Sequence, residues 1–431
     1  MPLINNSLKK IKKELYYPLT VFFNKSVQVM TMGNLKETTV EKFKKYILQT
    51  YAPSMLIVRG KGSEVWDDDN RRYLDFATGI SVCNLGHCHE KVTKAIQEQA
   101  AKLVHVSNLY YNEVTPLLAE KLVKNAFDGA VFFANSGAEA NEGMIKLARK
   151  FGSADGRYEI ISMVDSFHGR TLATLAATGR AKYRQGFAPD VQGFKQVPFN
   201  DFEALKNAVT DKTCAIMLEP LQGEGGIIPA DKEYLRQVRA LCDEKNLLLL
   251  FDEVQCGMGR TGNLFAFKTF GIEPDVVSMA KAIANGMPMG AFLVKRKYAD
   301  VLKVGEHAST FGGTPLASSA ALAVLEAIEE ENLLDNCQKM GDYLKTRLSE
   351  IIKPYEFVKE VRGLGLMIGI VLDHNGNSLR EVILNNGLIV LTAGETVVRL
   401  LPALNITKEN ADEALAIIEK SLAEYSIALK K

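Results

Sequence analysis

The stretch NLLLLFDEV, residues 246–254, decides the fold of this 431-residue chain. Five consecutive apolar residues, 247–251, end at the carboxylate of Asp252, and a segment of helical period at 232–245 precedes them. A short apolar run that follows an amphipathic helix is typical of a buried strand in a parallel sheet. Because ligands bind beyond the carboxyl ends of such strands, the residue after each apolar run is a candidate for chemistry.

Similar apolar runs recur on both sides of this stretch, with segments of helical period between them. They are VFFA (131–134), EIISMV (159–164), CAIMLE (214–219), DVVSMA (275–280) and GAFLV (290–294), and a helix is expected at about 139–151. This alternation predicts an α/β domain with a mainly parallel sheet. From about 325, a long helical segment precedes strand candidates at 365–372 and 397–404, which predicts a second, smaller α+β domain.

Composition excludes several classes of protein. With 47% hydrophobic and 24% charged residues, the chain is expected to be globular, and its length predicts two or three compact units at roughly 150 residues each. The 52 basic and 51 acidic residues give a net charge of +1, so no general attraction to nucleic acid or to an anionic membrane is expected. The apolar runs are far shorter than the roughly 20 residues that span a bilayer.

The six cysteines are sparse and irregularly spaced, which predicts reduced thiols in the cytoplasm or in an organelle matrix. Cys83, His87, Cys88 and His89 form one cluster that could suggest a metal site. No second Cys/His pair with ligand spacing accompanies this cluster, so we expect no bound metal.

Residues 1–32 differ from the rest of the chain. They contain five lysines, one acidic residue (Glu14) and the apolar run YYPLTVFF at 16–23. A secretory signal would need a small-residue cleavage site and a transit peptide would contain more arginine. We therefore expect either a disordered leader, a targeting segment, or a true start at Met30 or Met32.

Chemically distinctive residues follow three of the apolar runs. The turn NSGA (135–138) starts a helix, so its backbone amides could bind a phosphate, although many such turns only require small residues. Asp252 is either a cap or a buried anion that needs a cationic partner. Lys281 closes the run at 275–280, where burial would lower its pKa and make the amine nucleophilic, although most lysines are solvated.

Together these three features match the needs of one cofactor. Pyridoxal 5'-phosphate requires a lysine for its aldehyde, an aspartate for its protonated ring nitrogen and a helix N-terminus for its phosphate. The combination predicts a pyridoxal-phosphate enzyme built around Lys281 and Asp252.

At these residues the chain resembles the class III pyridoxal-phosphate aminotransferases. The similarity runs from about 50 to 407 and includes HVSNLYYNE (105–113), NSGAEANEGMIKLARK (135–150), SFHGRT (166–171), EPLQGEGGI (219–227), LLLFDEVQCGMGRTG (248–262), AKAIANGMPMGA (280–291), STFGGTPLASSAA (309–321) and VVRLLPALNI (397–406). The resemblance implies the type I fold, with a seven-stranded, mainly parallel sheet in the large domain and a small α+β domain formed by the chain ends. The implied division is a leader at 1–32, small-domain parts at 33–75 and 326–431, and a large domain at 76–325.

The resemblance also implies a role for each matching residue. Lys281 would bond to the cofactor and shuttle the transferred proton, and Asp252 would hold the pyridine nitrogen. The other implied cofactor contacts are Ser136, Gly137 and Ala138 at the phosphate, Thr310 of a neighbouring subunit also at the phosphate, Phe167 on the ring face, Gln255 at the phenolic oxygen and Glu219 in support. The implied substrate contacts are Arg170 and Arg399 for carboxylates, Glu224 as a partner that releases Arg399 when 2-oxoglutarate binds, and Ser309 near the amino donor.

By the same resemblance, the expected reaction is transamination of N2-acetyl-L-ornithine with 2-oxoglutarate, in a homodimer with active sites at the subunit interface and located in the cytoplasm. The alternatives are another ω-amino donor (ornithine, succinylornithine, N-succinyl-diaminopimelate or 4-aminobutyrate), an aminomutase or decarboxylase, or an inactive scaffold. Ile80 stands where ornithine-specific enzymes tend to carry a tyrosine, which favours an acylated donor. Ala138 and Thr314 replace the family's more frequent Thr and Asn, which leaves a weaker grip on the cofactor open. His168 is expected to help fix Phe167, and no histidine is expected to act in acid–base chemistry.

Overall fold

The computed structural model describes residues 32–430, and these fall into two compact units, one within residues 1–56 and one within residues 57–431. The first contains helix α1 (Met32–Tyr46). The expected leader at 1–32 lies outside the described residues, apart from Met32. The second unit holds every strand and all the residues considered for chemistry.

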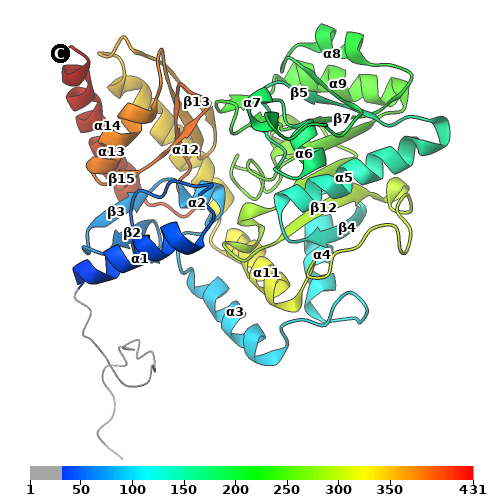
Figure 1. Ribbon diagram of the computed structural model, residues 1–431, viewed down its shortest axis with the longest axis horizontal. Helices are drawn as coiled ribbons and strands as arrows, with labels where there is room; N and C mark the ends of the chain where they lie inside the picture. Colours follow the sequence, from blue (N-terminus) through cyan, green and yellow to red (C-terminus); the bar gives the residue numbers. More distant parts are fainter. Residues whose placement is uncertain (1–31, 431) are drawn as a thin grey trace, which may run out of the picture. The chain divides into compact units, whose positions relative to one another are not determined.

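A seven-stranded sheet forms the centre of the larger unit (Figure 1). Its strands, in spatial order, are β4 (Gly129–Ala134), β12 (Gly290–Lys295), β11 (Val276–Met279), β10 (Leu248–Asp252), β7 (Thr213–Leu218), β5 (Glu159–Met163) and β6 (Phe194–Val197). Strand β12 alone runs opposite to the other six strands of this sheet, so the predicted α/β fold with a mainly parallel sheet is confirmed. Strand β6 was not among the expected runs, because its side chains alternate between core and solvent at the sheet edge.

Helices cover both faces of this sheet, which explains the uninterrupted apolar run of β10. Leu248 and Leu250 pack in one cluster with side chains of α5 (Gly137–Gly152), whereas Leu249 and Phe251 pack in another with side chains of α9 (Lys232–Lys245). All four side chains are fully buried, and each such burial stabilises the fold by about 1.5–3 kcal/mol. The two faces together therefore fix β10 at the centre of the sheet and carry Asp252 to its carboxyl end.

Further helices pack around the sheet or connect it to the remaining parts of the unit (Figure 1). They are α3 (Glu90–Lys102), α4 (Val114–Asn125), α6 (Leu172–Ala177), α7 (Ala181–Arg184), α8 (Phe202–Ala208), α10 (Ala266–Phe270) and α11 (Pro315–Glu330). The long helical segment expected from about 325 is in fact two helices, α11 and α12 (Leu333–Ile351). Asn332 between them has a φ of 52°, and this left-handed conformation interrupts the helix.

Outside the central sheet lie a two-stranded sheet, β8 (Leu221–Gln222) with β9 (Ile228–Pro229), and two four-stranded sheets. The first four-stranded sheet contains β1 (Ile57–Lys61), β2 (Glu64–Asp67), β3 (Arg72–Asp75) and β15 (Leu388–Ile389), and the second contains β13 (Val358–Leu364), β14 (Met367–Leu372), β17 (Val397–Leu400) and β16 (Leu391–Ala393). Strand β15 pairs in parallel with β3, so one sheet joins strands from both ends of this unit. Helices α13 (Asn377–Asn385) and α14 (Lys408–Leu429) complete the C-terminal part.

One turn has an unusual backbone. In the short element α2, Thr78, Gly79, Ile80 and Ser81 have φ values of 46°, 65°, 66° and 60° in succession. Such left-handed conformations cost a non-glycine residue about 1–2 kcal/mol each. The turn leads directly into Val82, whose side chain lines the main cavity of the protein.

Hydrogen bonds hold this turn from several sides. The Asp75 carboxylate accepts the Thr78 backbone N–H at 2.9 Å, and the Thr78 hydroxyl donates to the Leu401 carbonyl at 2.8 Å. The buried Arg260 donates from Nε to the Ser81 hydroxyl at 3.0 Å. The surrounding structure therefore compensates for the strain that the turn stores.

Candidate active site

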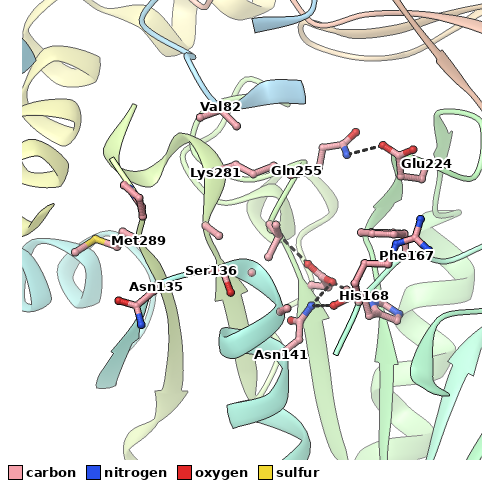
Figure 2. A pocket seen from close by; sticks show the side chains of 18 of the residues that line it. Val82, Asn135, Ser136, Asn141, Phe167, His168, Glu224, Gln255, Lys281 and Met289 are labelled. Carbon is pink, nitrogen blue, oxygen red and sulfur yellow. Dashed lines mark hydrogen bonds and ion pairs between the residues drawn. The ribbon is translucent and has the colours of Figure 1, made fainter. Parts of the chain in front are cut away.

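A cavity of about 400 Å³ lies at the carboxyl ends of β10 and β11. Figure 2 shows side chains converging on it from the ends of several strands. Of the residues that the sequence singled out, the cavity is lined by Ser136, Gly137, Ala138, Phe167, Arg170, Glu219, Glu224, Asp252, Gln255 and Lys281. The position is the one that open α/β sheets use for ligands.

Lys281 follows β11 directly and begins a short 3-10 turn, Lys281–Ala284. Its amine has no hydrogen-bond partner among residues 32–430, and it lies in the cavity close to Val82 and Gln255 (Figure 2). Burial lowers the pKa of the Lys281 ammonium, and the positive charge of Arg399 adds to this effect. A larger share of free amine at neutral pH makes Lys281 a better nucleophile and base.

Asp252 ends β10 with its carboxylate fully engaged. Oδ2 accepts hydrogen bonds from Asn141 Nδ2 at 2.7 Å and from His168 Nδ1 at 2.8 Å, and Oδ1 accepts the Val254 backbone N–H at 3.0 Å. Asn141 also donates to the His168 carbonyl at 2.7 Å, which closes a small network. These donors bind both carboxylate oxygens and fix the position of Asp252 at the cavity.

The sequence analysis missed Asn141 as a partner of Asp252 and gave His168 a different role. His168 does neighbour Phe167, but its imidazole points to Asp252 (Figure 2). Asn141 lies four residues after Gly137 and therefore shares its helix face, a spacing that could have pointed to it. The pairing of Asn141 with Asp252 spans 111 residues and has no local signal.

The start of α5 forms one end of the cavity. Ser136 is the N-cap, and its hydroxyl accepts the Glu139 backbone N–H at 3.2 Å. The amides of Gly137 and Ala138 have no carbonyl one turn back, and they lie at the positive end of the helix dipole. A Cβ at Gly137 would lie 2.8 Å from a Val254 methyl group, so this close approach of the helix requires glycine. The arrangement suits a phosphate.

Glu219 connects two parts of the cavity wall. Its carboxylate accepts the Phe167 backbone N–H at 2.8 Å and the Gly223 backbone N–H at 3.1 Å. Burial raises the pKa of Glu219 to about 7, although the nearby His168 works in the opposite direction. Glu219 thus fixes both the segment that presents the Phe167 ring and the loop that carries Glu224.

Arg399, on β17, is buried behind the cavity and pairs with Glu224. Arg399 Nη1 lies 2.6 Å from Glu224 Oε1 and 2.8 Å from Gln255 Oε1. Gln255 Nε2 in turn donates to Glu224 Oε1 at 3.3 Å, a bond drawn in Figure 2. Burial works to raise the pKa of Glu224, but the charge and hydrogen bond of Arg399 outweigh it and hold that pKa below its usual value. Glu224 is therefore a carboxylate at neutral pH and neutralises Arg399.

Arg170 is exposed to the cavity without such a partner. Its guanidinium lies over the Tyr183 ring, 3.8 Å from the ring centroid, and Phe167 is 5.4 Å away. No carboxylate of the described residues forms an ion pair with Arg170. A planar guanidinium held by an aromatic ring can bind a carboxylate in bidentate fashion.

Ser309 and Thr310 do not line the main cavity within one chain. They line a separate cavity of about 340 Å³ together with Asn135 and Phe311. Asn135 borders both cavities, and its Nδ2 donates to the Ser309 hydroxyl at 3.2 Å. The two cavities are therefore neighbours.

The Cys/His cluster noted in the sequence is engaged in other contacts. His87 pairs with Asp75 at 2.8 Å and His89 with Glu331 at 3.0 Å. Within residues 32–430, no group of three or more His, Cys, Asp or Glu side chains could hold a metal ion. In the same part of the chain, no helix is both long and apolar enough to cross a membrane.

With this geometry in place, similarity to known proteins can be stated. The family described as "Aminotransferase class-III" matches residues 47–422, and the chain belongs to that family. It is a pyridoxal-phosphate-dependent aminotransferase with the type I fold. Its cavity fits the cofactor: a lysine amine with no hydrogen-bond partner among residues 32–430, a carboxylate positioned by Asn141 and His168, and a helix start that only glycine allows to approach Val254.

Two similar proteins and two similar structures place the chain more closely. The Methanocaldococcus jannaschii protein named acetylornithine aminotransferase is 52% identical over 90% of this chain and 99% of its own length. A Pseudomonas aeruginosa protein, named succinylornithine transaminase/acetylornithine aminotransferase, is 46% identical over 89% of this chain and 96% of its own. The Toxoplasma gondii ornithine aminotransferase structure superposes with a TM-score of 0.88 at 32% identity, covering 92% of this chain and 96% of that one. The Stenotrophomonas maltophilia N-acetylornithine aminotransferase structure has a TM-score of 0.78 at 37% identity, covering 90% and 100%.

Proposed function

We propose that this aminotransferase transfers the ω-amino group of N2-acetyl-L-ornithine to 2-oxoglutarate, giving N-acetyl-L-glutamate 5-semialdehyde and L-glutamate, a step of arginine biosynthesis. The Glu224–Arg399 ion pair, in the wall of the cavity that holds Lys281, carries this proposal. It provides a carboxylate site that can be closed for one substrate and opened for another. The names of the similar proteins support the choice of donor.

The residues proposed to hold the cofactor surround one cavity. When bound, pyridoxal phosphate supplies an aldehyde that bonds to amines and a ring that withdraws electrons from the bonded carbon. Asp252 would bind the protonated ring nitrogen, since Asn141 and His168 hold its carboxylate in place at the cavity. Phe167 would cover the ring face, and Gln255 would donate to the phenolic oxygen.

The phosphate would bind at the start of α5. The amides of Gly137 and Ala138 and the Ser136 hydroxyl would donate to it there. Thr310 of a partner subunit would add a further hydroxyl from across the dimer interface, and Glu219 would support the wall between Phe167 and Gly223.

Lys281 is the proposed proton carrier. Its lowered pKa leaves an amine that can take a proton from the amine-bearing carbon of the substrate and return it at the cofactor. Because its amine has no hydrogen-bond partner among residues 32–430, it is free to change position between these two atoms.

Arg170 and Arg399 would allow the cavity to bind two substrates with different numbers of carboxylates. With Glu224 on Arg399, the cavity presents one free guanidinium, Arg170, which suits the single carboxylate of acetylornithine. When Glu224 swings away, Arg399 can bind the second carboxylate of 2-oxoglutarate. Ser309, one cavity further, would lie near the donor.

The proposed assembly is a homodimer whose active sites lie at the subunit interface. Beside the cavity of Ser309 and Thr310, the side chains of Leu109, Tyr110 and Tyr111 are almost entirely exposed. Asn108 ties this segment to the Ser309 carbonyl at 2.9 Å. Large clustered apolar side chains on a monomer surface mark an interaction site, and a second copy would cover them and bring its own Thr310 into reach.

The donor can be tested by half-reaction titrations of the purified protein with acetylornithine, ornithine, succinylornithine and 4-aminobutyrate. We expect acetylornithine to bleach the cofactor absorbance most efficiently, and Lys281→Ala to bind the cofactor without turnover. Preference for ornithine would keep the chemistry and reject the donor. Absence of any cofactor absorbance would reject the enzymatic proposal. We place the enzyme in the cytoplasm because all six cysteines are unpaired and four of them are buried.

A further inference from the structure

A third cavity, of about 420 Å³, lies on the other side of the loop that carries Glu224. Its walls include Arg180 and Lys182 at α7, Arg362 on β13, and the backbone of Gly225, Gly226 and Gly394. Figure 1 shows α7 facing β13 across this region. The cavity shares no lining residue with the main one, and the two are separated by the segment Glu224–Gly226.

Arg362 Nη1 forms an ion pair with Glu360 at 3.0 Å, whereas Arg180 and Lys182 have only distant carboxylates. Arg180 Nε lies 3.9 Å from Asp165, and Lys182 Nζ lies 3.9 Å from Glu395, both beyond hydrogen-bond distance. Asp165 and Glu395 are mostly exposed, so water screens them. Arg180 is itself more than nine-tenths buried, and its Nε has no hydrogen-bond partner.

The walls leave room between these cations. Gly394 has a φ of 62°, and a Cβ there would point toward Arg180 Nη2 at 4.0 Å and the Gly225 carbonyl at 3.8 Å. A side chain at this position would therefore enter the cavity. This cavity is lined by Arg180, Lys182 and Arg362 together with the mostly exposed carboxylates of Asp165 and Glu395, and its volume suits a small polar anion beside the buried Arg180 guanidinium.

The same cations hold the backbone of the Glu224 loop. The Glu224 carbonyl accepts hydrogen bonds from Arg180 Nη2 and from the Gly394 backbone N–H, the latter at 2.7 Å. Arg362 donates twice to the Gly226 carbonyl, at 2.7 and 3.0 Å. A ligand that binds to Arg180 therefore affects the position of Glu224, whose carboxylate neutralises Arg399.

We propose that this cavity is a binding site for a small oxyanion, carrying carboxylate or phosphate groups, and that its occupancy weakens the hold of Glu224 on Arg399. The anion competes with the Glu224 carbonyl for the Arg180 guanidinium. The loop then loosens, and Arg399 becomes more available to a dicarboxylate substrate. The binding itself is independent of the proposed transamination, whereas its effect on the Glu224–Arg399 pair rests on it.

Binding is tested by calorimetric titration of the cofactor-loaded enzyme with inorganic phosphate and with citrate at constant ionic strength. The loaded form is used because the cofactor's own phosphate then fills the start of α5. Tighter binding of phosphate would indicate a phosphate-bearing ligand, and tighter binding of citrate would indicate a carboxylate-bearing one. We expect saturable binding that Arg180→Gln weakens about tenfold or more, since it removes a charged donor.

Lys182→Gln keeps the test decisive should Arg180→Gln fail to fold, because Lys182 is largely exposed. We expect it to weaken binding about two- to fivefold. Lys94→Gln is the matched control, since Lys94 is also exposed, at 73% against 58% for Lys182, and lies 3.9 Å from a single carboxylate, Glu98. Absence of saturable binding, or equal weakening by Lys182→Gln and Lys94→Gln, would overturn the site.

The coupling is measured on the same proteins. We expect phosphate to lower the Michaelis constant for 2-oxoglutarate about twofold in the wild type, and Lys182→Gln to need an about two- to fivefold higher phosphate concentration for the same effect. A raised or unchanged constant in the wild type would overturn the coupling through Arg180. Calorimetry measures binding without turnover. The binding result therefore stands even if the proposed transamination reaction is rejected.

Discussion

His168 Nδ1 lies 2.8 Å from Asp252 Oδ2, and both side chains are shielded from solvent. A carboxylate at this depth requires donors, and Asp252 has Asn141, His168 and a backbone amide. The imidazole thus helps to position the buried carboxylate. The other ring nitrogen, His168 Nε2, has no hydrogen-bond partner among residues 32–430, so the imidazole is held through its bond to Asp252.

Replacing His168 by Phe is expected to weaken cofactor binding and to lower kcat, each by about tenfold. The variant leaves a buried carboxylate with one donor fewer, which costs about 1–3 kcal/mol. Cofactor affinity can be measured from its absorbance, and stability from chemical unfolding. His307→Phe, at a partly buried ring outside the main cavity, is the control. Equal effects of the two substitutions would contradict the role of His168.

Glu224→Gln is expected to change the two half-reactions in opposite directions. Removal of the negative charge leaves Arg399 open, so 2-oxoglutarate should bind several-fold more tightly, while the half-reaction with a monocarboxylate donor slows by about tenfold. Stopped-flow absorbance of each half-reaction separates the two effects. A parallel decline in both would indicate general damage to the site and would reject the gating role.

Glu219 is expected to make the stability of the enzyme depend on pH. Its pKa is about 7 in the folded protein and near 4.5 when unfolded, so the folded state binds the proton more tightly. The contribution is fully present below pH 4.5 and is lost as pH rises through 7, by up to about 3 kcal/mol. Chemical unfolding between these pH values should therefore show a steeper decline for the wild type than for Glu219→Gln. The exposed Glu98→Gln should behave as the wild type does.

Gly137→Ala is expected to weaken cofactor binding about tenfold, because the new Cβ would meet the Val254 methyl group at 2.8 Å and displace the start of α5. A second substitution, Val254→Ala, removes that methyl group. We expect the double variant to recover a large part of the lost affinity. If Val254→Ala restores nothing, the close approach of helix and Val254 is not what positions the phosphate.

The proposed dimer can be tested at its exposed tyrosines. Tyr110→Asp combined with Tyr111→Asp should shift the protein toward monomers and reduce cofactor affinity, since Thr310 of the partner would be lost. Light scattering and sedimentation measure the assembly. Tyr158→Asp, at another exposed tyrosine, should leave it unchanged. A wild-type monomer with full activity would refute the assembly.

Local pattern predicted most of the central sheet. The run ending at Asp252 and the helix at 232–245 appear where their periodicity indicates, because burial on both faces leaves little choice. The edge strand β6 escaped notice, since its half-exposed residues lack an apolar run. The break at Asn332 was also missed, because a single left-handed residue is set by tertiary packing.

The resemblance indicated residues of which most line one cavity in the structure; their roles stay predictions, and their pairings had no local signal in the sequence. Resemblance named Asp252, Lys281, Glu224 and Arg399, but nothing local indicated that Asn141 would donate to Asp252. Gln255 likewise bridges Arg399 and Glu224, contacts that depend on how three distant segments meet. Such cross-chain bonds arise from the assembled fold, so sequence spacing alone does not reveal them.

The turn at Thr78–Ser81 follows a path close to the mirror image of an ordinary helical turn. A D-amino acid prefers that path as strongly as an L-residue resists it. A semisynthetic enzyme with D-isoleucine at position 80 should therefore accept the reversed chirality there, and even gain stability. In the regular helices the same replacement would be disruptive. The turn that leads into Val82, at the edge of the cavity, is therefore one place where the protein can accept a D-amino acid.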